Sequence, residues 1–191
     1  TLNAAMAYNG PTVVSGGVLR VLGSLPAASA LTVVPGARLT LNNAAVKSVT
    51  VSALTLGDAA DTAPAQIELG IDAAAKTNDQ LVVTGELTAH HAAFYLYFQS
   101  SQTDNVIANG RYALIRYAGS DPDPAAFSVA NPQPGKSYTF SVLGQTLYVD
   151  VGAATADAYV WASAGGGDWT ETEKWVSAPG AGAAGAAVRF D

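Results

Sequence analysis

The chain of 191 residues contains no cysteine. This absence excludes disulfide bridges, zinc sites with thiolate ligands, iron–sulfur clusters and cysteine nucleophiles. Charged residues are also scarce, at 13% of the sequence against roughly 25% in an ordinary globular protein. The nine lysines and arginines are scattered and the formal net charge is −6, so the chain lacks the basic patch that nucleic-acid binding needs. No apolar run approaches the roughly 18 residues of a transmembrane helix, and we expect no membrane span.

Helical periodicity is nearly absent from the sequence. Only residues 72–76 have a helical composition, and this stretch is shorter than the dozen or so residues that a stable helix needs. Short runs rich in Val, Leu, Thr, Tyr and Phe recur instead, each closed by Gly, Pro, Asn or Asp, as β-strands are. The runs cover residues 12–14, 18–22, 31–34, 38–41, 49–56, 66–71, 80–84, 94–98, 112–117, 138–142 and 145–151. The sequence therefore predicts an all-β protein.

The first strands belong to a repeat. Residues 12–21 can be laid over residues 32–41, which places Leu19 against Leu39. Shorter copies follow within residues 50–57 and 81–88. A single unit of strand, glycine turn and strand cannot bury its own apolar face, so the copies must stack. Stacked coils with parallel strands form a β-solenoid, which we predict for this chain, with a β-sandwich as the alternative fold.

Four glycines fall at the turns of this repeat. They are Gly16, Gly17, Gly36 and Gly85, and the same superposition places Gly16 on Gly36. Glycine at a corner permits a positive φ or the close approach of the next coil's backbone, which a β-branched residue would resist.

The second half of the chain differs from the first. After about residue 90 the repeat weakens and the strands become longer and more aromatic, as in a broader sheet or a terminal cap. Residues 120–136 hold four of the nine prolines, which predicts a surface excursion because proline cannot donate to a central strand. We predict a solenoid body over residues 1–152, a linker of small residues over 153–158 and a Trp-rich segment over 159–191. The first residues show no basic and apolar leader, so we expect a processed or excised piece.

The segment over residues 9–25 (NGPTVVSGGVLRVLGSL) resembles the autotransporter-associated β-strand repeat of bacterial surface proteins. Residues 79–85, 110–120 and 137–151 are similar to consecutive late strands of such passenger regions, and the tail is similar to the opening of a new unit. The resemblance implies a right-handed, extracellular parallel β-helix that serves as a stalk or passenger body. It implies no catalytic residues.

The polar residues give little support to an enzyme or a metal site. His90 and His91 are neighbours that point to opposite faces of a strand, so they cannot share a metal, and we predict no metal and no cofactor. The carboxylates near turns fit Asx capping better than calcium binding; they are Asp58, Asp61, Asp72, Asp79, Asp121 and Asp123. A polysaccharide-acting β-helix enzyme is the rival, and it would need Glu68, Glu86 and Asp79 on one face.

Aromatic residues supply the candidate contact surfaces. Alternation predicts that Phe94, Leu96 and Phe98 point inward and that Tyr95 and Tyr97 point outward. The two tyrosines are expected to pack across strands against Tyr112 or Tyr117, or else to stack on sugars. Three tryptophans at the C-terminal end suit a cap or an adhesive end that docks on another copy; they are Trp161, Trp169 and Trp175.

These observations predict a non-enzymatic structural module of an extracellular or cell-surface protein. The tail matches what would precede the head of another copy, so we expect self-association, as a homo-oligomer or a fibre assembled head-to-tail through exposed edge strands. Neighbouring repeats of a longer chain would serve equally as partners. A carbohydrate-binding module, with a surface glycan as partner, is the alternative.

Overall fold

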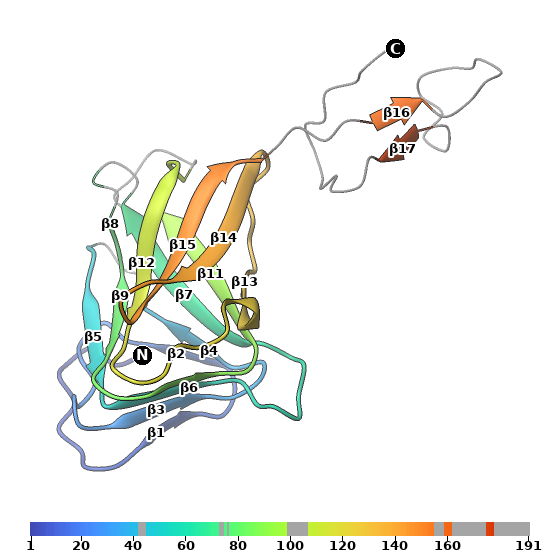
Figure 1. Ribbon diagram of the computed structural model, residues 1–191. Helices are drawn as coiled ribbons and strands as arrows, with labels where there is room; N and C mark the ends of the chain where they lie inside the picture. The colour runs from blue at the N-terminus through green and yellow to red at the C-terminus, as the bar shows by residue number, and fades with distance from the viewer. Residues whose placement is uncertain are drawn as a thin grey trace.

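The computed structural model describes residues 1–41, 45–72, 75, 77–98, 107–154, 159–161 and 175–177 (Figure 1). Strands dominate these residues, and the only helix among them is a single 3-10 turn, η1 (Pro124–Ala126). The predicted all-β class is confirmed.

The strands lengthen along the chain. Those of the first part have three or four residues: β1 (Thr12–Val14), β2 (Val18–Arg20), β3 (Ala30–Val33), β4 (Arg38–Thr40), β5 (Ser48–Val51) and β6 (Ala53–Leu56). Five later strands have seven or eight: β7 (Ala65–Asp72), β11 (Ala92–Phe98), β12 (Gly110–Arg116), β14 (Lys136–Val142) and β15 (Thr146–Ala153). The remaining strands are short: β8 (Thr77–Asn78), β9 (Gln80–Val83), β10 (Leu87–Ala89), β13 (Phe127–Val129), β16 (Tyr159–Trp161) and β17 (Trp175–Ser177).

Three sheets build the part of the structure up to residue 154. Sheet I has the order β1-β3-β6-β10, sheet II the order β13-β11-β7-β4-β2 with β8 added on β7, and sheet III the order β14-β15-β12-β9-β5. All neighbours in sheets I and II are parallel except β7 and β8. Sheet III begins with parallel neighbours, β5, β9 and β12, and ends with the antiparallel pairs β12–β15 and β15–β14. The sheets of this protein are therefore mainly parallel.

The chain visits the sheets in a recurring order. β4, β5 and β6 lie in sheets II, III and I, and the same order returns with β7, β9 and β10 and again with β11 and β12. Parallel strands cannot be joined by a tight hairpin and need a crossover connection. In the middle of the chain this crossover runs through strands of the other two sheets: β4 and β5 lie between β3 and β6 in the sequence, and Figure 1 shows β3 and β6 side by side.

Parallel pairing in register stacks apolar side chains into columns. Three of these columns are Leu31, Leu54 and Leu87 in sheet I, Leu39, Ile67 and Phe94 in sheet II, and Val49, Leu81 and Ile115 in sheet III. Every one of these side chains is at most 2% exposed. Full burial of a Val, Leu, Ile or Phe side chain contributes about 1.5–3 kcal/mol, so the columns hold the sheets together.

The repeat predicted from the sequence is present, but its register changes between sheets. Leu19 pairs with Leu39 as predicted. Thr12 pairs with Leu31 and not with Thr32, because the turn between β1 and β2 is one residue shorter than the turn between β3 and β4. We call the passage of the chain from one strand to its parallel neighbour in the same sheet a circuit. Later circuits are longer, because Leu54 pairs with Leu87, which is further along the chain from it than Leu54 is from its other partner, Leu31. The spacing that separates Leu19 from Leu39 therefore describes the first circuit only.

The later strands close one end of the structure. Phe140 of β14 lies over sheet II, with its ring centroid 5.7 Å from that of Phe94 and 5.9 Å from that of Phe127. Phe94 and Phe127 are themselves 6.0 Å apart. The change to antiparallel pairing at β15 and β14 thus brings an aromatic cluster over the end of the apolar columns.

The proline-rich segment contains a strand that the sequence analysis did not predict. β13 lies inside the predicted excursion and pairs with β11 at the edge of sheet II. The prolines lie before and after β13 and not within it, so an edge strand with its full set of N–H groups fits between them. Beyond residue 154, β16 and β17 form a separate two-stranded antiparallel sheet. The predicted linker lies mostly outside the described residues.

Candidate functional site

One candidate surface is the end of the structure formed by β1 and β2. These strands are the terminal strands of sheets I and II. Val13 is 56% exposed and Val18 is 61% exposed. A terminal strand presents backbone N–H and C=O groups that can pair with another strand. Part of β2 already has a partner, because the N–H of Leu2 donates to the carbonyl of Arg20 at 2.7 Å.

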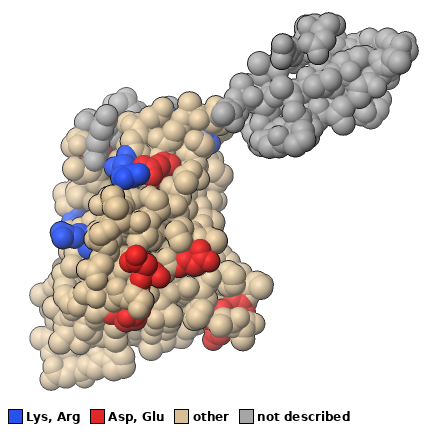
Figure 2. All heavy atoms as spheres, viewed as in Figure 1, with Lys and Arg blue, Asp and Glu red and all other residues tan. Residues whose placement is uncertain are grey.

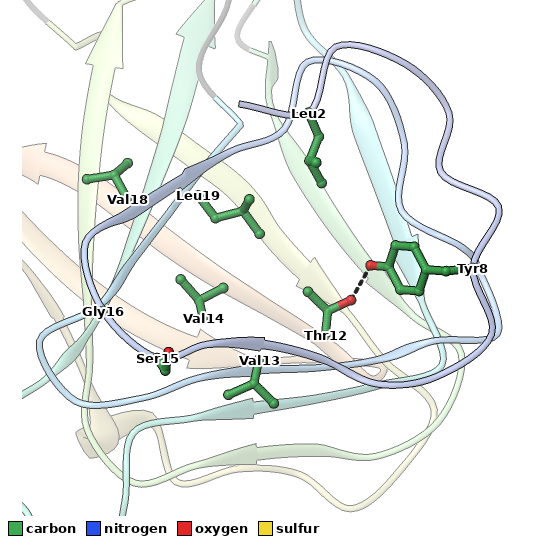
Figure 3. A pocket seen from close by; sticks show the side chains of 9 residues that line it. All are labelled: Leu2, Tyr8, Thr12, Val13, Val14, Ser15, Gly16, Val18 and Leu19. Atoms are coloured by element: carbon green, nitrogen blue, oxygen red, sulfur yellow. Dashed lines mark hydrogen bonds between the residues drawn. The ribbon is translucent and has the colours of Figure 1, made fainter.

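An apolar hollow opens beside these two strands. Figure 3 shows Leu2, Val14 and Leu19 pointing toward one another inside the loop made by the first residues of the chain, with Val13 and Val18 pointing away. The hydroxyl groups of Tyr8 and Thr12 form a hydrogen bond at one side of the hollow, as the dashed line in Figure 3 marks. The full lining is Leu2, Tyr8, Thr12, Val13, Val14, Ser15, Gly16, Val18 and Leu19. Leu19 begins the column that Leu39 continues, so the hollow is the open end of the core. The local sequence pattern does not indicate this hollow, because it forms where Leu2 folds back beside β2.

The second candidate surface is the outer side of sheet II. Phe94 and Leu96 are buried and Tyr97 is 39% exposed, which confirms the predicted division of faces in β11. The side chain of Phe98 lies outside the described residues. The predicted packing of Tyr95 and Tyr97 on Tyr112 or Tyr117 is wrong. Tyr95 and Tyr97 stack on each other, with ring centroids 6.1 Å apart and ring planes at 11°.

Tyr112 and Tyr117 point away from this surface, into the core. They are only 1% and 5% exposed. The Tyr112 hydroxyl donates to the carbonyl of Ala108 at 2.9 Å, and the Tyr117 hydroxyl donates to Asp121 at 2.6 Å. Their polar ends are therefore satisfied within the fold.

Polar side chains from neighbouring strands complete the surface around Tyr95. The guanidinium carbon of Arg38 lies 4.0 Å from the centroid of the Tyr95 ring. The Nε and Nη2 atoms of Arg38 donate to Oε1 of Gln66 at 2.9 and 2.7 Å, and Nη1 lies 3.5 Å from Oε2 of Glu68. Register explains the grouping, since Arg38 pairs with Gln66 and Glu68 pairs with Tyr95. We call the outer side chains of Arg38, Gln66, Glu68, Tyr95 and Tyr97 the tyrosine face.

A buried carboxyl group links successive circuits. Asp79, which the sequence analysis assigned to a turn, is fully buried. Its Oδ1 accepts a hydrogen bond from the N–H of Lys47 at 2.9 Å and its Oδ2 accepts one from the N–H of Gly70 at 2.7 Å. The Lys47 ammonium group in turn donates to the carbonyls of Val21 and Gly23 at 2.7 and 2.9 Å. Burial raises the pKa of Asp79 to about 6, and the nearby Lys47 charge and the two hydrogen bonds oppose this increase.

Other carboxylates cap turns as predicted. Asp58, Asp61 and Asp123 each accept a hydrogen bond from the N–H two residues onward, at 2.8 to 2.9 Å. In the described part of the chain, no three His, Asp or Glu side chains come close enough together to hold a metal ion.

The three acids of the rival enzyme hypothesis occupy different places. Glu68 belongs to the tyrosine face and Asp79 is buried. Glu86 accepts a hydrogen bond from the N–H of Ser120 at 3.3 Å. Because Asp79 is buried, it does not share a solvent-facing groove with the other two acids.

The predicted turn glycines fall into three groups. Gly17 and Gly36 have φ angles of 65° and 75°, in the left-handed region that favours glycine. A Cβ atom on Gly85 would lie 2.7 Å from the carbonyl oxygen of Ser52, so close backbone approach explains this residue. Neither reason applies to Gly16, where a Cβ atom would meet nothing within 4 Å. Gly57, which the sequence analysis missed, combines both reasons, with a φ of 75° and a Cβ position 2.7 Å from the carbonyl oxygen of His91.

The tryptophans are described only in part. Trp161 and Trp175 are direct partners across the antiparallel pair β16–β17. Trp169 lies outside the described residues. Their predicted role as a cap or docking end stays a prediction.

Charge is dispersed on the face shown in Figure 2, where acidic and basic residues lie singly or in small groups among uncharged ones. The described part of the chain offers no helix with the length and hydropathy that crossing a lipid bilayer demands. Comparison with protein-family models, curated proteins and solved structures found no match to this chain.

Proposed function

We propose that this chain is a right-handed parallel β-solenoid that acts as a non-enzymatic structural module, a spacer or fibre-forming unit, of an extracellular bacterial surface protein. The observation that carries the proposal is the recurring order of sheets II, III and I, in which the two circuits β4 to β6 and β7 to β10 each add one parallel strand to each sheet. Such a fold grows along one axis with every repeat.

The pairing pattern argues against the alternative sandwich. A β-sandwich packs two antiparallel sheets whose strands are joined by hairpins and Greek-key connections. Here the antiparallel pairs of the three sheets are confined to β7–β8 and to the end of sheet III. The columns of stacked apolar residues also suit a solenoid, because each circuit buries its apolar side chains against the circuits above and below.

The two ends of the proposed solenoid differ, and this difference favours assembly at one of them. The end at β14 is covered by Phe140 over Phe94 and Phe127. The end at β1 and β2 has exposed Val13 and Val18 beside an apolar hollow. A further parallel coil, from a neighbouring repeat or from a second copy, would bury this surface by continuing the columns. The resemblance of residues 9–25 to autotransporter-associated repeats supports the location on a cell surface.

The proposal is tested by measuring shape and self-association together. Small-angle X-ray scattering is expected to give particles whose longest dimension increases with concentration, and light scattering after gel filtration is expected to show oligomers that grow with concentration. Negative-stain electron microscopy of the same samples is expected to show filaments.

Variants identify the surface responsible. Val13→Lys and Val18→Lys place charges on the terminal strands and are expected to return the protein to monomers. Leu143→Lys is the matched control, because Leu143 is also exposed, at 62%, but follows β14 at the other end. A monomer at every concentration, or equal loss of assembly in the control, contradicts assembly through β1 and β2.

A further inference from the structure

We propose that the tyrosine face binds a neutral oligosaccharide, with one sugar ring stacked on Tyr97 and the sugar hydroxyl groups hydrogen-bonded to Arg38 and its carboxylate and amide neighbours. This inference goes beyond the structural role proposed above and does not depend on it.

The aromatic part of the surface is partly exposed to solvent at Tyr97. Tyr97 is 39% exposed, and its partner in the neighbouring strand β7 is Gly70, which has no side chain to cover the ring. The nearly parallel Tyr95 ring, 6.1 Å away, supports Tyr97 from its own strand. The C–H groups on one face of a pyranose ring pack well on an aromatic ring of this kind, because the ring face is negative and the C–H edges are positive.

The polar part of the surface supplies donors and acceptors close together. Arg38 offers a planar set of N–H donors, and Glu68 and Gln66 offer carboxylate and amide oxygens, all joined by contacts of 2.7 to 3.5 Å. A sugar hydroxyl group both donates and accepts a hydrogen bond, so it is best satisfied where both kinds of group are present. All five side chains stand on parallel strands, which hold them in fixed positions before any ligand arrives.

The charges on this face favour a neutral sugar. The Arg38 cation is paired with the Glu68 carboxylate at 3.5 Å and lies over the Tyr95 ring at 4.0 Å. A phosphate or a uronic acid would have to displace the carboxylate to pair with Arg38. A neutral hydroxyl group can instead bridge the two charges without separating them.

The test is isothermal titration calorimetry with soluble neutral hexasaccharides of glucose, galactose and N-acetylglucosamine, and with a galacturonic acid hexasaccharide as the charged comparison. We expect the unmodified chain to bind at least one neutral sugar, and Tyr97→Ala to weaken that binding by about tenfold or more.

Tyr148→Ala is the matched control. Tyr148 also packs against an arginine, with the Arg111 guanidinium 5.4 Å from its ring and paired with Asp150, but on sheet III. Urea unfolding of each variant verifies that it is folded.

Retained affinity in Tyr148→Ala together with a loss in Tyr97→Ala supports the proposal. Absence of heat with every neutral sugar overturns it, as does equal loss in both variants or binding of the galacturonic acid sugar alone. Each of these outcomes leaves the particle shape and the self-association of the chain unchanged. Failure of the sugar site is therefore distinguishable from failure of the structural role.

Discussion

The backbone N–H of Lys47 donates a hydrogen bond to Oδ1 of Asp79 at 2.9 Å, and this contact joins the segment before β5 to the segment before β9 at a fully buried carboxyl group. Sheet III pairs β5 with β9 directly after these residues. The carboxyl group therefore stands where two circuits meet, and its protonation affects how firmly they are held.

Stability is expected to fall as the pH rises from about 4 to about 7. Burial raises the pKa of Asp79 from 3.8 to about 6, so the folded state holds the proton more tightly than the unfolded state does. The resulting stabilisation is complete below the unfolded pKa and is lost as the pH rises through the folded pKa. A pKa increase of this size corresponds to up to about 3 kcal/mol in the free energy of unfolding. Urea denaturation across this pH range measures the effect.

Asp79→Asn is the variant that tests this assignment. Asparagine replaces one of the two carboxyl oxygens by an NH2 group, which cannot accept the hydrogen bond that the N–H of Lys47 or Gly70 donates there. The variant is therefore expected to lose about 1–3 kcal/mol at pH 4 and to show a flat profile up to pH 7. Asp58→Asn, in an exposed turn, is the control and should keep the pH dependence. A slope that survives in Asp79→Asn would assign the proton to another group.

Lys47→Met is expected to move this pH transition upward. The Lys47 charge lowers the pKa of Asp79, so its removal allows burial to raise that pKa further. The substitution also deprives the carbonyls of Val21 and Gly23 of a donor, with an expected cost of about 1–2 kcal/mol. Carbon-detected NMR titration of the Asp79 carboxyl group measures the shift, and an unchanged midpoint would show that the charge has no influence.

Substitution by alanine is expected to destabilise the protein at Gly57, where the backbone requires glycine, and to have little effect at Gly16, where it does not. Gly57→Ala combines a φ of 75° with a Cβ position 2.7 Å from the carbonyl oxygen of His91, and we expect a loss of at least about 1–2 kcal/mol. Gly16→Ala meets no neighbour within 4 Å and should stay within about 0.5 kcal/mol of the parent. Thermal and urea unfolding of both variants give the comparison. Equal effects would contradict the assigned backbone roles.

The aromatic cluster at the closed end is expected to behave as a coupled unit. Phe94→Ala removes a fully buried ring and should cost about 3–5 kcal/mol. Phe140→Ala, at a partly buried position, should cost less. A double-mutant cycle is expected to give a coupling energy of about 0.5–1.5 kcal/mol. Simple additivity would indicate that β14 does not pack on β11 in solution.

Local patterns predicted the strands better than they predicted how the strands stack. Alternation correctly placed Phe94 inside and Tyr97 outside, and the repeat correctly paired Leu19 with Leu39. The partner predicted for Thr12 from the repeat, Thr32, is wrong, because Thr12 pairs with Leu31. The cause is the turn between β1 and β2, which is one residue shorter than the turn between β3 and β4. Such a difference leaves almost no trace in the composition. Strand β13 was missed for a similar reason, since the prolines around it dominate the local pattern.

The candidate surfaces were predictable only in part. Side chains alternate between the two faces along a strand. The outward orientation of Tyr95 and Tyr97 could therefore be predicted from the sequence. The partners of Tyr95 come from β4 and β7, and their identity depends on circuit lengths that the sequence does not reveal. Burial of Asp79 also depends on three separate segments meeting, and a lone aspartate beside a turn gives no sign of that.

The unequal circuits have a consequence for how such a chain can change. Leu31, Leu54 and Leu87 stay in one column, although the stretch of chain from Leu54 to Leu87 is longer than the stretch from Leu31 to Leu54. Part of the extra length lies in the longer strand β7, and part lies at the corner between β6 and β7, where the chain passes from sheet I to sheet II. New sequence, including foreign peptides for display, can therefore be inserted at the corners while the ladders keep their spacing.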